Sequence, residues 1–195
     1  LPLFLDGKGM LNEPVIEVTE QSQKFRFLGV TERPVLSINR GASAPIALNA
    51  DISASDLLFL MGHDSDPFNS WEAGQTVGRA IIIDTIRNNR MPPQIEDFSK
   101  ALQAALTNQK LDNAFKALML ALPQETELAA SLAGDADADA VFAARETVRQ
   151  TISRSIMREL ESAYHDTAER GPYSPDTAGT ARRSLHLAAL YAAAR

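Results

Sequence analysis

A histidine and two aspartates lie within four positions of one another, at His63, Asp64 and Asp66. Imidazole nitrogens bind zinc and carboxylates bind hard divalent cations, so these side chains are of types that hold metals. Neighbouring residues on one short turn seldom aim at a common centre without a third segment, however. Helix ends explain the same residues, because histidine suits a helix C-terminus and aspartate suits an N-cap. We therefore interpret the stretch as a corner between two helices, packed by Phe68 and Trp71.

The two remaining histidines are no better candidates for a metal-binding or catalytic site. His165 precedes Asp166 near an expected helix end, where such a pair is usually solvated, and His186 lies in an alanine- and leucine-rich helix, where it suits an interface or the core. Neither begins the His-Glu-x-x-His pattern of a zinc-binding helix. Basic residues at 170 and 182–183 are accompanied by Glu169, which favours a solvated face over an anion site. The sequence predicts no catalytic, no cofactor-binding and no metal-binding residue in this chain.

Composition excludes several classes of partner. The chain has 195 residues, 45% of them hydrophobic, which is ample for a packed core. With 25 acidic and 19 basic residues its net charge is −6, so neither nucleic acid nor an anionic membrane surface is expected as a partner. No apolar stretch reaches the roughly 18 to 20 residues that span a bilayer. The absence of cysteine suits a reducing compartment, and we expect a cytoplasmic location.

The pattern of the first fifty residues is typical of short strands. Apolar and polar residues alternate there, and prolines and glycines separate the alternating runs. These features predict a small β-sandwich portion over residues 1–50, with five strands at 1–5, 15–19, 24–30, 34–39 and 44–48.

From residue 51 the pattern becomes helical. Ser53 begins a capping box, and Asp66 with Pro67 begins a second helix that must end before the prolines at 92–93. Successive helices without intervening strands predict an all-α domain of antiparallel helix pairs over residues 51–195, stacked as an α-solenoid, and the chain as a whole is then of the α+β class. Further helices are predicted at about 95–107, 112–122, 126–132, 139–169, the longest, and 180–195.

The last helix is apolar on nearly every side. Leu185 and Ala189 lie on one side, while Leu187, Leu190 and Tyr191 lie on another. A helix of this kind belongs between two layers, so we expect a further helix pair to be missing from this chain. The chain alone is then expected to self-associate through this helical end or to let the helix fray.

Two strings carry a family resemblance. The string "RPVLSINRGASAPIAL" (33–48) and the nearby "DLLFLMGHDSDPFNSWEAGQTV" (56–77) resemble the bacterial aminopeptidase N family of gluzincin metallopeptidases, which remove N-terminal residues from peptides. In that family the first string closes a β-sandwich third domain and the second opens a helical C-terminal domain. Ala42 stands where the family usually has phenylalanine, and Ser70 stands where arginine often precedes the tryptophan.

The resemblance implies that the catalytic machinery lies elsewhere. The family's zinc helix and the loop that grips the substrate's amine belong to an upstream domain, and none of those positions maps onto this sequence. We therefore expect a non-catalytic fragment that covers and shapes the active-site cavity of a zinc aminopeptidase. Its partners would be the missing catalytic domain of the same chain and, for the whole enzyme, peptide substrates.

Two alternatives have different sequence signatures. An independent helical scaffold for protein interactions would show the same helices, but it would not need the aminopeptidase-like strings. A carbohydrate-binding β-module should expose aromatic residues on its strands, whereas the single tryptophan, Trp71, lies in the helical part.

Overall fold

The computed structural model describes residues 3–5, 10–11, 15–28, 30, 33–132, 134, 137–169 and 171–194. The chain divides into two compact units, Leu1–Leu36 and Ser37–Arg195. The larger unit contains every helix among the described residues, and it also contains all but the first four residues of the two strings that carry the family resemblance.

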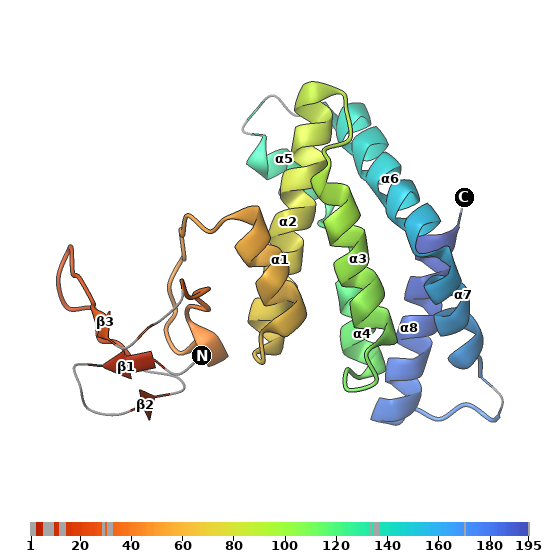
Figure 1. Ribbon diagram of the computed structural model, residues 1–195. Coiled ribbons are helices and arrows are strands. Elements are labelled where there is room, and N and C mark those ends of the chain that lie inside the picture. Colours follow the sequence, from red (N-terminus) through yellow and green to blue (C-terminus); the bar gives the residue numbers. More distant parts are fainter. Residues whose placement is uncertain are drawn as a thin grey trace. The chain divides into compact units, whose positions relative to one another are not determined.

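The smaller unit contains a sheet of three short strands, β1 (Leu3–Leu5), β2 (Met10–Leu11) and β3 (Phe27–Leu28). Strand β1 is central and pairs antiparallel with both neighbours (Figure 1). The prediction of a strand within residues 1–5 is confirmed, and the one at 24–30 is confirmed only for two residues. The described residues of this unit form one sheet, so a sandwich of two sheets is not shown.

The strands expected at 15–19, 34–39 and 44–48 are wrong, because these described segments adopt no strand. Their apolar side chains are largely exposed, for example 86% for Val15, 54% for Ile46 and 51% for Leu48. Alternation specifies which face of a strand would be buried, but a strand forms only where a partner satisfies its backbone N–H and C=O groups. Residues Arg40–Ala42 instead form a short 3₁₀ turn.

The helical unit follows the predicted order of elements. Side chains of Ser53 and Asp66 cap the first two helices, as expected, and aspartates at 112, 137 and 176 cap three later ones. The helices are α1 (Ala54–His63), α2 (Pro67–Asn88), α3 (Gln94–Thr107), α4 (Asn113–Leu120), α5 (Glu125–Ser131), α6 (Ala138–Ser155), α7 (Met157–Asp166) and α8 (Thr177–Ala193).

Helix pairs build the core of this unit. Helix α1 packs on α2, α2 packs on α6, and α8 lies between α4 and α7 (Figure 1). The largest side chains with under 2% exposure come from five helices and the helix break at 156, and they are Ile82, Leu102, Leu128, Val141, Val148, Ile156 and Leu160. Burying each such side chain contributes roughly 1.5 to 3 kcal/mol, so this core holds the helical unit together.

The prediction of a single long helix over 139–169 is wrong. The chain bends at Ile156, which has φ −122° and ψ 25°, and the segment forms two helices, α6 and α7. Ile156 is 1% exposed and Leu160 is fully buried. The bend lets the two helices pack on different partners, since α6 packs mainly on α2 and α7 packs mainly on α8. Periodicity cannot reveal such a bend, because the apolar stripe continues through it. Among the residues that the structure describes, the longest helix is α2, with 22 residues.

Two glycines on α2 permit close packing. A Cβ atom at Gly78 would lie 3.3 Å from Cδ of Pro123 and 3.5 Å from the ring of Phe98, and one at Gly74 would lie 3.4 Å from Sδ of Met61. Both glycines are buried. Their missing side chains therefore let α2 approach its neighbours at distances that a branched side chain would prevent.

We expect Gly78→Val to lower the free energy of unfolding by about 1 to 3 kcal/mol, because the added carbons overpack the contact with Pro123. Gly62→Val is the matched control: this glycine is exposed on α1, and a Cβ there meets nothing within 4 Å. Its replacement should leave stability unchanged or raise it by a few tenths of a kcal/mol through helix propensity. Urea denaturation measures both, and equal effects at the two sites would contradict the packing role of Gly78.

Candidate functional site

The candidate metal cluster lies at the corner between α1 and α2. His63 is the last residue of α1 and is exposed. Its Nδ1 lies 3.0 Å from the backbone oxygen of Phe59, and its ring stacks on the Phe59 ring at 4.5 Å. The imidazole therefore binds its own helix end, as the interpretation of a helix C-terminus predicted.

Asp66 uses both carboxylate oxygens to hold backbone N–H groups. Oδ1 accepts from Phe68 N at 2.9 Å and from Asn69 N at 3.1 Å, which caps α2. Oδ2 accepts from Gly41 N at 2.7 Å, 25 residues earlier in the chain. The hydrogen bond from Gly41 is the main reason why the pKa of Asp66 lies below its usual value, and the bonds that cap α2 act in the same direction.

Asp64 is held by an arginine from the preceding loop. Its side chain is 1% exposed, and Oδ1 pairs with the guanidinium of Arg40 and accepts from Asp66 N at 2.9 Å. The same guanidinium donates to Ser65 Oγ at 2.7 Å and to Ser37 Oγ at 3.1 Å. Oδ2 of Asp64 is buried without a partner. This carboxylate therefore depends on Arg40 for its compensation.

Asn69 completes the connection from the first turn of α2. Its side-chain amide donates to Ser37 Oγ at 2.8 Å and to the backbone oxygen of Ile38 at 2.9 Å. We call Arg40, Asp64, Asp66 and Asn69 the corner clamp, because together they fasten the loop 37–42 to the α1–α2 corner. The clamp joins the two strings of the family resemblance in space.

The aromatic packing at this corner differs in part from the expectation. Trp71 is half-buried and packs against Phe68, with ring centroids 5.8 Å apart. Phe68 is 60% exposed, so it lies at the surface and not in the core of the corner. Ser70, the departure from the family pattern, is buried and donates to the backbone oxygen of Met61 at 2.7 Å. A serine here therefore ties the start of α2 to α1.

In the parts of the chain that the structure describes, no three histidine, cysteine or acidic side chains gather where they could hold a metal ion. At the corner, Asp66 already accepts from backbone N–H groups and Asp64 from Arg40. The arrangement performs a structural task, which is to fix a loop to a helix corner.

The other histidines also lie where their helices explain them. His165 and Asp166 are both exposed at the end of α7. His186 stacks on the ring of Tyr164 at 4.2 Å, and its Nδ1 lies 3.0 Å from the Tyr164 backbone oxygen. His186 therefore joins α8 to α7, which confirms its interpretation as an interface residue.

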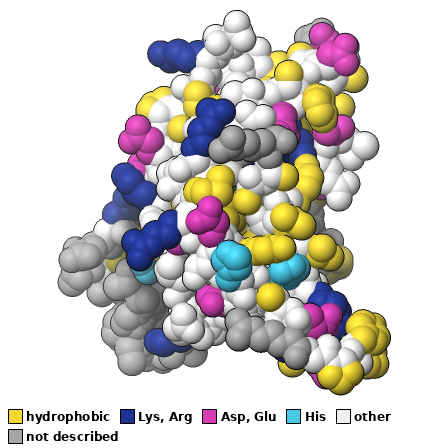
Figure 2. All heavy atoms as spheres, turned by 90° about the vertical axis from the view of Figure 1, so that its right-hand side faces the viewer, with side chains coloured by type: hydrophobic (Ala, Val, Ile, Leu, Met, Phe, Trp, Pro, Cys, Tyr) yellow, Lys and Arg dark blue, Asp and Glu magenta, His cyan; other side chains and the backbone are white. Residues whose placement is uncertain are grey.

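The basic residues near the start of α8 are partnered. Glu169 accepts from Arg183 at 2.8 Å and lies 3.8 Å from Arg182. The Arg183 guanidinium also lies over the ring of Tyr173, 4.5 Å from its centroid. Acidic and basic side chains are interspersed on the face seen in Figure 2. These pairs agree with a solvated face of mixed charge.

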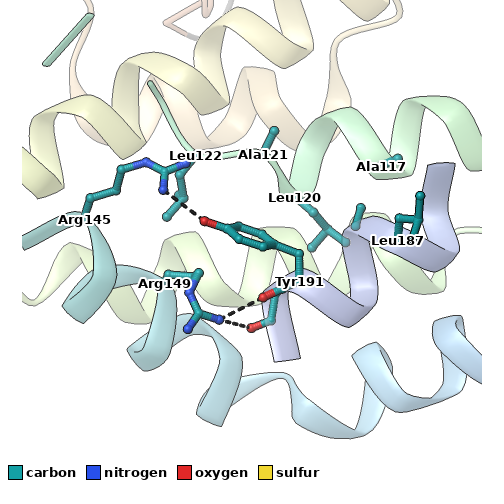
Figure 3. A pocket seen from close by; sticks show the side chains of 10 residues that line it. Ala117, Leu120, Ala121, Leu122, Arg145, Arg149, Leu187 and Tyr191 are labelled. Carbon is teal, nitrogen blue, oxygen red and sulfur yellow. Dashed lines mark hydrogen bonds between the residues drawn. The ribbon is translucent and has the colours of Figure 1, made fainter. Parts of the chain in front are cut away.

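Sequence reasoning missed a groove between α4 and α8, with a volume of about 330 Å³. It is shown in Figure 3, where the ring of Tyr191 lies across it. Arg145 donates from Nε to the backbone oxygen of Pro123 at 2.9 Å and from Nη1 to the Tyr191 hydroxyl at 3.3 Å. The lining residues are mostly apolar, and they are Ala117, Leu120, Ala121, Leu122, Arg145, Arg149, Leu187, Ala188, Tyr191 and Ala192.

Arg149, a second arginine that lines the groove, binds the C-terminal end of α8. Its Nη1 donates to the backbone oxygens of Tyr191 at 2.9 Å and Ala192 at 2.8 Å, which satisfies carbonyl groups at the end of α8 (Figure 3). Glu146 accepts from Nε of Arg149 at 2.9 Å. Hydrogen bonding to Arg149 is the main reason why the pKa of Glu146 is lowered to about 2, and Gln150 and the charge of Arg145 act in the same direction. The only sequence feature that could have pointed to this groove is the spacing of Arg145 and Arg149, four residues apart and so on one face of a helix.

The fold and the corner define a helical-repeat domain with a structural clamp, and the comparisons name its family. Residues 54–195 match the model of a domain of unknown function (DUF3458_C) described as ARM repeats, and residues 3–51 match a domain of unknown function (DUF3458) described as having an Ig-like fold. The chain belongs to this DUF3458_C family. Its helical architecture agrees with the predicted α-solenoid.

Bacterial aminopeptidases are similar to this chain over most of its length. Aminopeptidase N of Caulobacter vibrioides is 36% identical over 95% of this chain and 21% of its own, and that of Escherichia coli is 30% identical over 90% and 20%. This chain therefore spans about a fifth of these relatives, and it matches their C-terminal region. The resemblance seen in the two strings is confirmed.

A solved structure shows the same fold. The crystal structure of Legionella pneumophila aminopeptidase A in complex with aspartic acid matches 84% of this chain and 20% of that one, with a TM-score of 0.70 and 20% identity. Within the described ranges, no helix combines the length and the apolar content needed to cross a membrane.

We expect Arg40 and Asp64 to be strongly coupled. In a double-mutant cycle with Arg40→Met and Asp64→Asn, the interaction energy should be about 1 to 3 kcal/mol, because each single change leaves a largely buried group uncompensated. Lys100 and Asp97 on α3 provide a control, since their side chains are 70% and 67% exposed. That pair should give about 0 to 1 kcal/mol. Equal coupling in the two cycles, measured by urea denaturation, would contradict the clamp.

The Glu146–Arg149 pair should make stability depend on acid pH. The folded-state pKa of Glu146 is about 2, below its ordinary 4.5, so its contribution is present above pH 4.5 and is lost as pH falls towards 2. The loss should be roughly 1 to 2 kcal/mol, since the side chain is 28% exposed and partly screened. Glu146→Gln should flatten this limb of the stability curve. Glu161→Gln, at an exposed site on α7, should leave the limb as it is.

Proposed function

We propose that this chain is a non-catalytic segment of a zinc aminopeptidase that removes N-terminal residues from peptides. The observation that carries the proposal is the 36% identity to an aminopeptidase N across 95% of the chain. Since the described residues bring no three potential ligands together, the proposal places the zinc ion and the reacting groups in another part of the peptidase. The catalytic domain is then this segment's partner, and peptides are the substrate of the whole enzyme.

We further propose that the segment joins two domains. Residues 1–50 would belong to a β-sandwich with an Ig-like fold, and residues 51–195 to the helical domain. The two matched family models support a boundary near this position. The corner clamp would then span the junction, because it holds the loop 37–42, which precedes residue 51, against the corner between α1 and α2.

The role we propose for the helical part is to cover the active-site cavity and to shape it. Stacked helix pairs form extended curved surfaces, which suit the wall of a cavity that admits small peptides and excludes large ones. The apolar residues Leu187, Leu190 and Tyr191 are 63%, 48% and 58% exposed, which supports the expectation that α8 contacts another layer or a second copy. A cytoplasmic location stays a prediction.

A chimera tests this role directly. The matching segment of the Caulobacter aminopeptidase N is replaced by this chain, and kcat/KM is measured for a dipeptide and for a long peptide. We expect the chimera to keep activity on both, whereas deleting the segment should remove the discrimination against the long peptide. An inactive but folded chimera would favour the alternative of an independent interaction scaffold.

The chain alone provides the second arm of the test. We expect no turnover of aminoacyl chromogenic substrates above buffer and no tightly bound zinc by metal analysis, because the proposal assigns the zinc ligands to another domain. One zinc ion per chain, or turnover that a chelator abolishes, would contradict the proposal. The unreplaced Caulobacter enzyme, assayed in parallel, is the positive control.

A further inference from the structure

The groove between α4 and α8 combines apolar walls with hydrogen-bond donors at one end. Leu120, Leu122 and Leu187 contribute aliphatic surface, and its volume of about 330 Å³ lies within the range of small-molecule sites. In Figure 3, Leu187 lies towards one end and Arg145 towards the other, with the Tyr191 ring between them. A ligand lying along the groove would therefore place an apolar body at one end and a polar group at the other.

Arg145 is the cation available to such a ligand. Within the described chain no carboxylate forms an ion pair with it, and its bonds to Pro123 and Tyr191 use only Nε and Nη1. The bond to the Pro123 backbone oxygen fixes the plane of the guanidinium. Nη2 keeps its N–H groups, and a fixed guanidinium recognises a carboxylate with two parallel hydrogen bonds.

Tyr191 adds a second donor beside Arg145. Its oxygen accepts from Arg145, so the hydroxyl hydrogen is left to donate to another acceptor. Arg149 contributes no free charge here, because Glu146 and two backbone oxygens of α8 occupy it. Glu146 also interacts with Arg145 through its charge, so the two arginines and Glu146 together leave one net positive charge at the polar end of the groove. That end therefore selects an anion and disfavours a cation.

We propose that this groove binds a small apolar monocarboxylate, with its carboxylate on Arg145 and the Tyr191 hydroxyl and its hydrocarbon part against Leu120 and Leu187. A carboxylate is favoured over a phosphate because a single cation faces walls that are mainly aliphatic, where a second negative charge would be buried without compensation. Leu187 and Tyr191 also belong to the face of α8 for which a contact with another layer or a second copy is proposed above, so a bound carboxylate and such a layer would compete for the groove. The peptidase assignment itself does not depend on this binding site.

The probe is 4-methylpentanoate, compared with 4-methylpentanamide, which has a similar shape and no charge. Backbone amide NMR shifts of α4, α6 and α8 are followed during titration at a protein concentration where light scattering shows a monomer. We expect saturable shifts at the groove with the acid and binding about tenfold weaker or more with the amide, because the charge-assisted hydrogen bonds are lost.

Variants separate recognition from folding. Arg145→Gln should weaken binding of the acid about tenfold or more, and Tyr191→Phe, which keeps the ring and the backbone bonds to Arg149, should weaken it several-fold. Arg158→Gln removes an exposed charge from α7 and should leave binding unchanged. Thermal unfolding confirms that each variant folds, and Tyr191→Phe keeps the test decisive should Arg145→Gln unfold.

Four results would overturn the proposal. They are equal binding of acid and amide, no shifts at saturating acid, equal losses for Arg145→Gln and Arg158→Gln, and binding of a leucine-terminated peptide acid without any binding of 4-methylpentanoate. The last result would assign the groove to a peptide terminus instead of a small molecule.

Discussion

The ion pair between Arg40 and Asp64 is the constraint on which the start of the helical unit depends. A carboxylate that is 1% exposed, with one oxygen unpartnered, is costly to bury, and the arginine that compensates it comes from a loop 24 residues earlier. If the loop 37–42 moved away, the Asp64 carboxylate would be exposed to solvent or left buried without the arginine that compensates it. The left-handed backbone of Asn39, Gly41 and Ala42 fits this picture, because such a conformation persists where surrounding contacts hold it.

The same pair explains why two strings in the sequence are recognisable together. Asn-Arg-Gly and His-Asp-Ser-Asp-Pro look unrelated along the chain, yet Arg40 meets Asp64 and Gly41 meets Asp66 in space. Each aspartate performs a local task and a distant one, since Asp66 caps α2 and also holds the loop. A cluster with the residue types of a metal site is thus used for charge compensation and capping.

Helix starts and the roles of the histidines could be predicted, because they depend on local chemistry. An aspartate followed by proline, as at Asp66, gives an N-cap in nearly any context. The bend at Ile156, the missing strands and the role of Gly78 depend on distant partners, so no local pattern reveals them. The clamp was hidden for the same reason: the sequence shows Arg40 and Asp64 but not that the chain brings them together.

The groove shows how two arginines on one helical face acquire different chemistry. Arg145 and Arg149 are four residues apart on α6 and both reach Tyr191, one at its hydroxyl and the other at its backbone oxygen. Glu146 pairs with Arg149, whose guanidinium is held against two backbone oxygens at the C-terminal end of α8. Because these bonds set the position of Tyr191, they also set the place where Arg145 meets the hydroxyl. Glu146 therefore acts on both arginines, through hydrogen bonds to Arg149 and through its charge on Arg145.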